Sequence, residues 1–164
     1  MALPGILVKQ YIEDLINEEK QVQPAGIDLT IMRVCMLEEA GELGFVHRKI
    51  PKGKELKTTN GYWELPPGAY RITYREIVKI PEDAVGICLP RSSLIRMGAT
   101  IFSAVWDPGY IGRGEGLLVV FNPYGIKLEK NARIAQLILI KLTQKPHTIY
   151  RGTYYGENIN INKL

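Results

Sequence analysis

Short apolar runs separated by turn residues dominate the hydrophobic pattern after residue 25. We expect strands at residues 27–35, 62–65, 69–77, 84–89, 100–106, 116–122, 132–142 and 147–150. Turn signals divide these runs, among them Pro66-Pro67-Gly68, Asp107-Pro108-Gly109 and Asn122-Pro123-Tyr124-Gly125. Many short strands at fairly even spacing indicate a mainly β chain, folded as a sandwich or barrel.

Two stretches depart from this β pattern. Residues 6–16 carry apolar side chains at helical spacing, with Val8 and Ile12 one turn apart, and predict one short amphipathic N-terminal helix. Residues 91–98 favour a short helical turn between two strands. The polar tail at 158–164 is expected to be mobile. With no repeat and no linker, residues 1–164 are expected to form a single domain.

Composition narrows the class of protein and of ligand. The 164 residues carry a net charge of +4 with a pI near 9.0, which suits an anionic ligand such as a nucleotide. No basic stripe interleaved with aromatic residues calls for nucleic acid, and no apolar run reaches the roughly 18 residues of a membrane span. Without an export signal, and with Cys35 and Cys88 far apart, we expect reduced thiols in a cytoplasmic protein.

The segment Pro90–Gly98 holds the first candidate site. Arg91 offers a fixed fork of N–H donors that matches phosphate oxygens, and Ser92 and Ser93 add hydroxyl and amide donors. Arg96 lies close by in the sequence. Taken alone, the same residues equally fit a serine-capped turn with solvated arginines.

A second candidate site surrounds Asp107. Pro108-Gly109 predicts a tight turn that places Asp107 at the mouth of a β-hairpin, where its carboxylate could deprotonate a water molecule. Tyr110 would offer a flat face beside it. Asp28 opens an apolar strand, and Gln136 is the one amide on another. Each of these residues also has a purely structural interpretation.

Four segments, in order "PAGIDL", "PRSSLIRMG", "WDPGYIG" and "ARIAQLIL", resemble the dCTP deaminase/dUTPase family over about residues 23 to 156. The resemblance implies a distorted jelly-roll (β-clip) barrel and a homotrimer with active sites between subunits. Within the family the chain is most similar to archaeal-type dUTPases. These are metal-dependent enzymes that use Mg²⁺ to hydrolyse dUTP to dUMP and pyrophosphate.

The resemblance also implies a role for each matching position. Asp107 would activate the attacking water, and Tyr110 would lie under the deoxyribose and exclude a 2′-hydroxyl. Asp28 would hold Mg²⁺ through water or brace the site. The other implied substrate-binding residues are Arg91, Ser92, Ser93 and Arg96 for the phosphates, Gln136 for phosphate or water, Ile101, Phe102, Ser103 and Val105 for the pyrimidine, and Tyr150 and Tyr154 in a tail that closes over the nucleotide.

The family contains two chemistries, and one position separates them. The deaminases need a Glu three residues before an Asn, but Val119 stands there before Asn122, so pyrophosphatase chemistry is favoured. Residues 112–116 make the segment between the Asp107 turn and Asn122 about two residues longer than is usual in the family. Glu115 within them could replace the missing acid, although a solvated loop position is the better interpretation. Arg113 could reach phosphate, a neighbouring subunit or only solvent. A deaminase, a bifunctional enzyme and a non-catalytic nucleotide-binding module remain alternatives.

Overall fold

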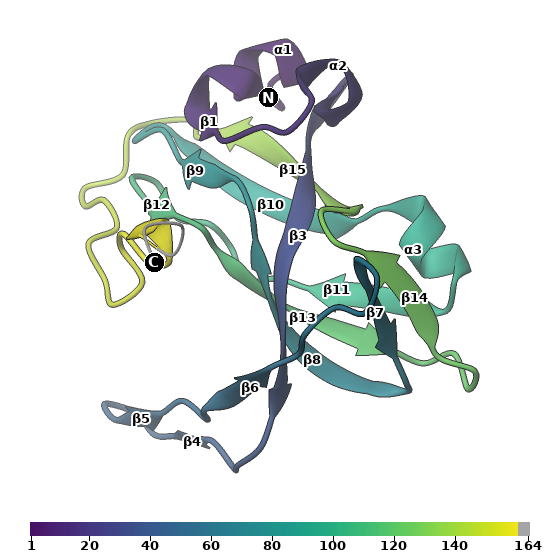
Figure 1. Ribbon diagram of the computed structural model, residues 1–164. Coiled ribbons are helices and arrows are strands. Elements are labelled where there is room, and N and C mark those ends of the chain that lie inside the picture. Colours follow the sequence, from purple (N-terminus) through teal and green to yellow (C-terminus); the bar gives the residue numbers. More distant parts are fainter. Residues whose placement is uncertain (161–164) are drawn as a thin grey trace.

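The computed structural model describes residues 1–160 and is mainly β, as predicted (Figure 1). The helical elements are α1 (Gly5–Val8), η1 (Lys9–Tyr11), α2 (Glu18–Gln21) and α3 (Ser92–Arg96). The strands are β1 (Ile12–Glu13), β2 (Val22–Gln23), β3 (Gly26–Leu37), β4 (Glu42–Leu43), β5 (Arg48–Lys49), β6 (Gly53–Glu55), β7 (Tyr62–Leu65), β8 (Gly68–Tyr74), β9 (Ile77–Lys79), β10 (Ala84–Pro90), β11 (Ala99–Phe102), β12 (Ile111–Gly112), β13 (Glu115–Val120), β14 (Ile126–Glu129) and β15 (Arg133–Lys141).

One eight-stranded antiparallel sheet forms the body, with the order β10-β15-β3-β8-β13-β11 and with β2 and β6 also paired to β3. The long strand β3 runs through the middle of the molecule and links the two halves of this sheet (Figure 1). Alternate residues of the strands point into one hydrophobic core, as the period of a half-buried strand requires. A smaller sheet, β1-β9-β12, contains the strand that follows the second candidate site, whereas the strand before it, β11, belongs to the large sheet.

The N-terminal helix is much shorter than predicted. Helical structure ends at Tyr11, and Ile12 enters a strand paired with Val78 of β9. Val8 and Ile12 are both buried, but the second is buried by strand pairing and not by a helix face. Asn17 caps the N-terminus of a separate helix, α2, where its side chain accepts a hydrogen bond from Lys20 N at 3.0 Å.

Three strand predictions need correction. The run 69–77 breaks into β8 and β9, because the buried carboxylate of Glu76 turns inward to accept hydrogen bonds from Thr30 and Gln21. The run 100–106 ends at Phe102, where local hydrogen bonds of Ser103 replace the ladder. The run 147–150 forms no strand. Strands β4 to β6 were not predicted, because their residues lack a periodic apolar pattern.

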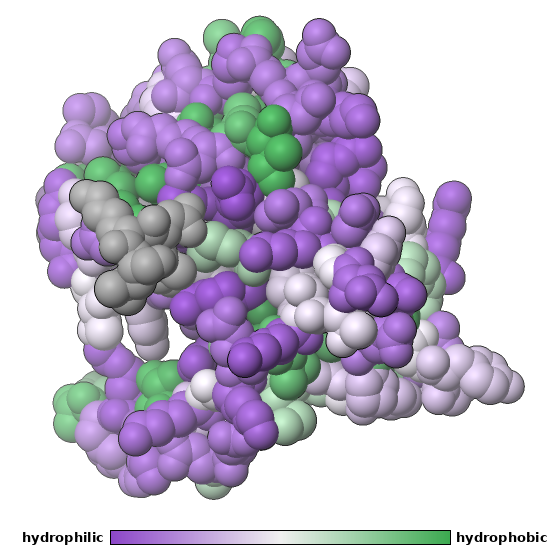
Figure 2. Space-filling view, in the orientation of Figure 1, coloured by the Kyte–Doolittle hydropathy of each residue, from purple (hydrophilic) through white to green (hydrophobic). Residues whose placement is uncertain are grey.

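Strands β4 and β5 form an arm that stands away from the body (Figure 1), with apolar atoms at its end in Figure 2. Phe45 at the tip is fully exposed. Arg48 reaches back from the arm to the hydroxyl of Thr153, and its guanidinium lies 5.9 Å from the Tyr154 ring centroid. The arm therefore contacts the C-terminal tail. In the tail, the Asn158 side chain donates hydrogen bonds to the Arg113 carbonyl and to Glu115, and the mobility of the tail stays a prediction. Residues 161–164 lie outside the described part of the chain.

Candidate functional site

A cavity of about 500 Å³ lies where the Asp107 turn, the start of β13 and the C-terminal tail meet. Six of the predicted residues line it, namely Ser103, Val105, Asp107, Tyr110, Tyr150 and Tyr154. Two separate segments, 103–110 and 150–154, supply them, so only the tertiary fold creates this cavity.

The turn that carries Asp107 is built by Pro108 and Gly109, and Tyr110 N donates to Asp107 O at 3.1 Å. Gly109 has φ +82°, a conformation that glycine adopts without strain. The turn does not close a hairpin, because β11 pairs with β13 whereas β12 pairs with β9. Asp107 thus stands at a crossing between two sheets, with its side chain exposed at the cavity.

Aromatic rings form the inner wall of the cavity. Tyr110 is buried, with its ring edge-on to Trp106 at 5.3 Å and tilted against Tyr150 at 5.9 Å. The indole Nε1 of Trp106 donates to Ser103 Oγ at 3.0 Å. Gly114 packs so closely that a methyl group there would lie 2.5 Å from the Trp106 ring. The wall is therefore rigid and apolar beside the exposed carboxylate of Asp107.

Two further carboxylates face the cavity. Glu115 is the first residue of β13 and not part of a solvated loop, which corrects the sequence interpretation. Its Oε2 lies 3.4 Å from Arg71 Nε, and its Oε1 accepts hydrogen bonds from Thr73 and Asn158 at 3.3 Å. Glu157 Oε1 accepts a hydrogen bond from the Tyr110 hydroxyl at 2.8 Å. Burial above all raises the pKa of Glu157 to about 7.

The Arg-Ser-Ser segment forms a second cluster, at one end of β3, β10 and β15. Asp28 Oδ2 lies 3.0 Å from Arg91 Nε and 3.1 Å from Arg133 Nη1. The carboxylate is buried, and burial raises the pKa of Asp28 although both arginines lower it. Gln136 stands directly across from Asp28 in the sheet. Ser92 and Ser93 begin helix α3 as predicted, with exposed side chains.

The structure does not bring the two clusters into one cavity. The described lining of the Asp107 cavity includes none of the second cluster's predicted residues: Asp28, Arg91, Ser92, Ser93, Arg96 and Gln136. Of the predicted pyrimidine-binding strand, Ile101 is buried in the core and Phe102 is exposed outside the lining. The roles of all these residues remain predictions.

Sequence reasoning missed Arg71, Ile50 and Glu157 as cavity residues. Arg71 and Ile50 come from segments with no chemical motif, and neither gives a local signal. Glu157 is an isolated acid in the tail, and no motif marks it either. Arg113 does not reach the cavity; its buried side chain forms an ion pair with Asp14.

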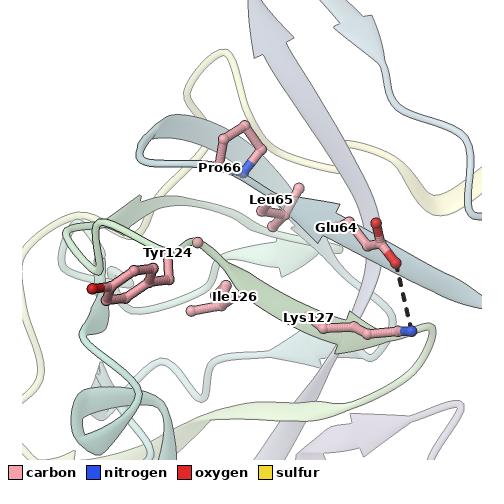
Figure 3. Close-up of a pocket in the computed structure, with 7 residues that line it drawn as sticks. Glu64, Leu65, Pro66, Tyr124, Ile126 and Lys127 are labelled. Atoms are coloured by element: carbon pink, nitrogen blue, oxygen red, sulfur yellow. Dashed lines mark ion pairs between the residues drawn. The ribbon is translucent and has the colours of Figure 1, made fainter.

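A second cavity, of about 600 Å³, lies between β7 and β14 (Figure 3). Its charged side chains are Glu64 and Lys127, which pair with each other at 3.5 Å and are largely exposed. This pair faces water and offers no candidate for acid–base chemistry, so we place the functional site at the Asp107 cavity.

Residues 1–160 show neither a metal-binding cluster nor a membrane-spanning helix. That region contains no group of three or more His, Cys, Asp or Glu side chains arranged to hold a metal ion. None of its helices is long and apolar enough to cross a membrane.

Comparisons with known proteins agree with the fold and the motifs. A crystal structure of 2′-deoxycytidine 5′-triphosphate deaminase from Agrobacterium tumefaciens superimposes with a TM-score of 0.64 at 17% identity, over 84% of this chain and 47% of that chain. This likeness is one of fold.

Sequence relatives are closer. A probable deoxyuridine 5′-triphosphate nucleotidohydrolase of Aeropyrum pernix is 46% identical over 84% of this chain and 87% of its own. The deoxyuridine 5′-triphosphate nucleotidohydrolase of Methanocaldococcus jannaschii is 40% identical over 90% and 94%. The family model described as dCTP deaminase-like matches residues 6–142. On these matches, the chain belongs to the dCTP deaminase-like family.

Proposed function

We propose that this chain is an enzyme that hydrolyses dUTP to dUMP and pyrophosphate. The names of its relatives describe that reaction for those proteins, and the match extends over most of their length. The observation that carries the proposal is the exposed carboxylate of Asp107, which lines a cavity beside the buried ring of Tyr110. A carboxylate in such a place can take a proton from water.

The geometry of Glu115 favours hydrolysis over deamination. Residues 116–121, which follow it along β13, are all apolar or glycine. The nearest acid that precedes Asn122 in the sequence is Glu115. Both of its carboxylate oxygens are engaged, by Arg71, Thr73 and Asn158. A carboxylate whose two oxygens are both engaged in this way is not free to carry a proton between the atoms of a substrate. Deamination of dCTP therefore remains the second candidate.

In the proposed reaction, Arg91, Ser92 and Ser93 bind the phosphates, with Arg96 and Gln136 in support. Asp107 accepts a proton from the attacking water, whose oxygen bonds to phosphorus while the linkage between the α- and β-phosphates breaks. Pyrophosphate leaves with the electron pair of that linkage. Most of the acceleration would come from holding water and phosphate in line.

We include Mg²⁺ in the proposal as the divalent ion. Mg²⁺ keeps several waters and commonly binds through one or two carboxylates together with substrate phosphates. The carboxylate of Asp28 offers oxygen ligands, the kind that Mg²⁺ prefers. Asp28 would hold it through water, although its Oδ2 is shared by two arginines. When bound, Mg²⁺ would neutralise charge developing on the phosphates.

We further propose that the enzyme is a homotrimer whose sites combine both clusters from neighbouring subunits. The separation of the phosphate cluster from the Asp107 cavity supports this, since a triphosphate nucleotide needs both. Apolar side chains are also exposed around α3, the end of β11 and the turn before β14, as expected of a surface that a partner covers. They are Leu89, Ile95, Met97, Phe102, Val105, Phe121 and Tyr124.

A cytoplasmic location completes the proposal. Cys35 and Cys88 are both free thiols. This redox state is normal for a reducing compartment, where disulfides are rare.

Assays of all common deoxynucleoside triphosphates with Mg²⁺ test the function directly. We expect pyrophosphate from dUTP and no ammonia from dCTP. Asp107→Asn keeps the shape of the side chain but cannot take the proton, so turnover should fall about 10²- to 10⁴-fold. The matched control is Asp83→Asn, which alters an exposed aspartate paired with Lys141. Ammonia release from dCTP would overturn the assignment, and near-normal turnover by Asp107→Asn would remove Asp107 from the mechanism.

A further inference from the structure

The tail is tied to the Asp107 turn through the side chains of Tyr110 and Glu157. The Tyr110 hydroxyl donates to Glu157 Oε1 at 2.8 Å. Burial raises the pKa of Tyr110, as do the carboxylate of Glu157 and the hydrogen bond to it, so the hydroxyl stays neutral and acts as a donor. Its ring is held on two sides by Trp106 and Tyr150. The hydrogen bond to Glu157 therefore fixes the hydroxyl end of a ring that Trp106 and Tyr150 already contact.

Backbone contacts bring Glu157 to this position. Gly156 N donates to Ile111 O at 2.7 Å, and Arg113 N donates to Glu157 O at 3.0 Å. Glu157 thereby forms a parallel bridge with Gly112. A methyl group on Gly112 would lie 2.6 Å from the Tyr110 hydroxyl and 3.2 Å from Glu157 Cγ. The glycine leaves the space in which the two side chains meet.

The surroundings of Glu157 are mostly neutral or acidic. Burial has the largest effect on its carboxyl and raises the pKa to about 7; the hydrogen bond from Tyr110 lowers the pKa, and the charge of Glu115 raises it. Arg113, on the adjoining backbone, is paired with Asp14. The other charged or titratable groups of this cavity are Arg71, Asp107, Tyr150 and Tyr154.

We propose that Glu157 is a positioning residue: its carboxyl fixes the Tyr110 ring in the cavity, so that docking of the tail and placement of the ring against the substrate are one event. The inference rests on the proposed dUTP hydrolysis for its reaction, and on the contacts of Tyr110 and Glu157 for the coupling. Its consequence is that the tail influences the sugar-facing wall directly, besides covering the cavity.

A double-mutant cycle tests the coupling during turnover. Glu157→Ala and Tyr110→Phe each remove one hydrogen bond and should lower kcat/KM for dUTP roughly 2- to 10-fold, mainly through KM. The double variant should be no worse than either single variant. Glu157→Gln keeps an acceptor oxygen and should restore near-normal KM. Glu64→Ala, at an exposed carboxylate of the other cavity, is the control. Additive effects, or a Gln variant as impaired as the Ala variant, would overturn the proposal.

Hydrogen exchange tests the docking without activity. The amide protons of Gly156 and Arg113 report whether the tail is docked, because each lies in a hydrogen bond between the tail and residues 111–113. A buried carboxyl with its pKa raised to about 7 is favoured in its protonated form, so docking is strongest at low pH and weakens as the pH rises through 7. After correction for intrinsic exchange, protection should fall between about pH 4.5, where the undocked carboxyl ionises, and about pH 7, where the docked one does, then level off in the wild type, and it should stay level throughout in Glu157→Gln.

The two experiments separate this proposal from the proposed function. An equal loss of protection in the wild type and in Glu157→Gln would overturn the coupling. If the wild type shows the pH-dependent docking but leaves dUTP intact, the coupling stands and the proposed reaction fails. If it hydrolyses dUTP with the tail docking independently of Tyr110, the reaction stands and the positioning role of Glu157 fails.

Discussion

Asp28 offers the sharpest test of how the phosphate cluster is held together. The Asp28 residue is 1% exposed; its Oδ2 accepts a hydrogen bond from Arg133 Nη1 at 3.1 Å and lies 3.0 Å from Arg91 Nε in an ion pair. If Asp28 only holds the two arginines in place, which we call the bracing role, an uncharged acceptor at this position is enough. A metal site, in contrast, needs the negative charge. Asp28→Asn removes the charge and keeps the shape, so it separates the two roles.

The expected magnitudes follow from these contacts. In Asp28→Asn the hydrogen bond from Arg133 keeps its charged donor, but the attraction of the carboxylate for two partly exposed arginines is lost, at about 1 kcal/mol for each and about 2 kcal/mol for both. Burial raises the pKa of Asp28, which means that the charge itself is costly in the folded state. Neutralising it recovers part of the loss, and we expect Asp28→Asn to cost about 1 kcal/mol of unfolding free energy.

Asp28→Ala is the matched variant that removes both shape and charge. Losing one partner of a buried ion pair typically costs about 3–5 kcal/mol. The two arginine side chains remain 29% and 31% exposed, so water screens them partly. We therefore expect about 3 kcal/mol, the low end of that range.

Urea unfolding measures both costs, and a Mg²⁺ titration of dUTP hydrolysis measures the role of the charge. If Asp28 is a brace, the Mg²⁺ midpoint of Asp28→Asn stays within about threefold of the wild type, because under 0.7 kcal/mol of binding has changed. Equal destabilisation by Asn and Ala would refute the bracing argument. A Mg²⁺ midpoint raised tenfold in the Asn variant would show that the carboxylate holds the ion.

Three further predictions concern the proposed site. Arg91→Ala should weaken binding of a non-hydrolysable dUTP analogue by about ten- to a hundredfold, because a charge-assisted bond is worth roughly 1.5–3 kcal/mol; calorimetry giving an unchanged Kd would contradict this. Tyr110→Ala should narrow the preference for dUTP over UTP in steady-state assays, mainly by admitting UTP, and a wild type that cleaves both equally would exclude the sugar-facing role. Mixed subunits of Asp107→Asn and Arg91→Ala, reassembled and assayed at dUTP concentrations where each alone is inactive, should regain activity; none would be regained if each site lay within one chain.

The local features of the fold were predictable because short-range forces decide them. The Asp107 turn needs only proline and glycine at adjacent positions, and helix α3 follows directly from the residues after Pro90. Strand β10 likewise matches its apolar run. The predicted N-terminal helix failed at Ile12, where pairing with Val78 of a distant strand outweighed helical spacing.

What the sequence determined by itself was the mainly β fold, its turns and the set of chemical groups that could act on a nucleotide. Tertiary structure alone decided how those groups are distributed: Asp28 lies between Arg91 and Arg133, while Asp107 opens into a separate cavity. It also placed Glu157 on Tyr110, 47 positions away. Such partners are selected by strand register and by burial of the whole chain, and no neighbour in the sequence reports them.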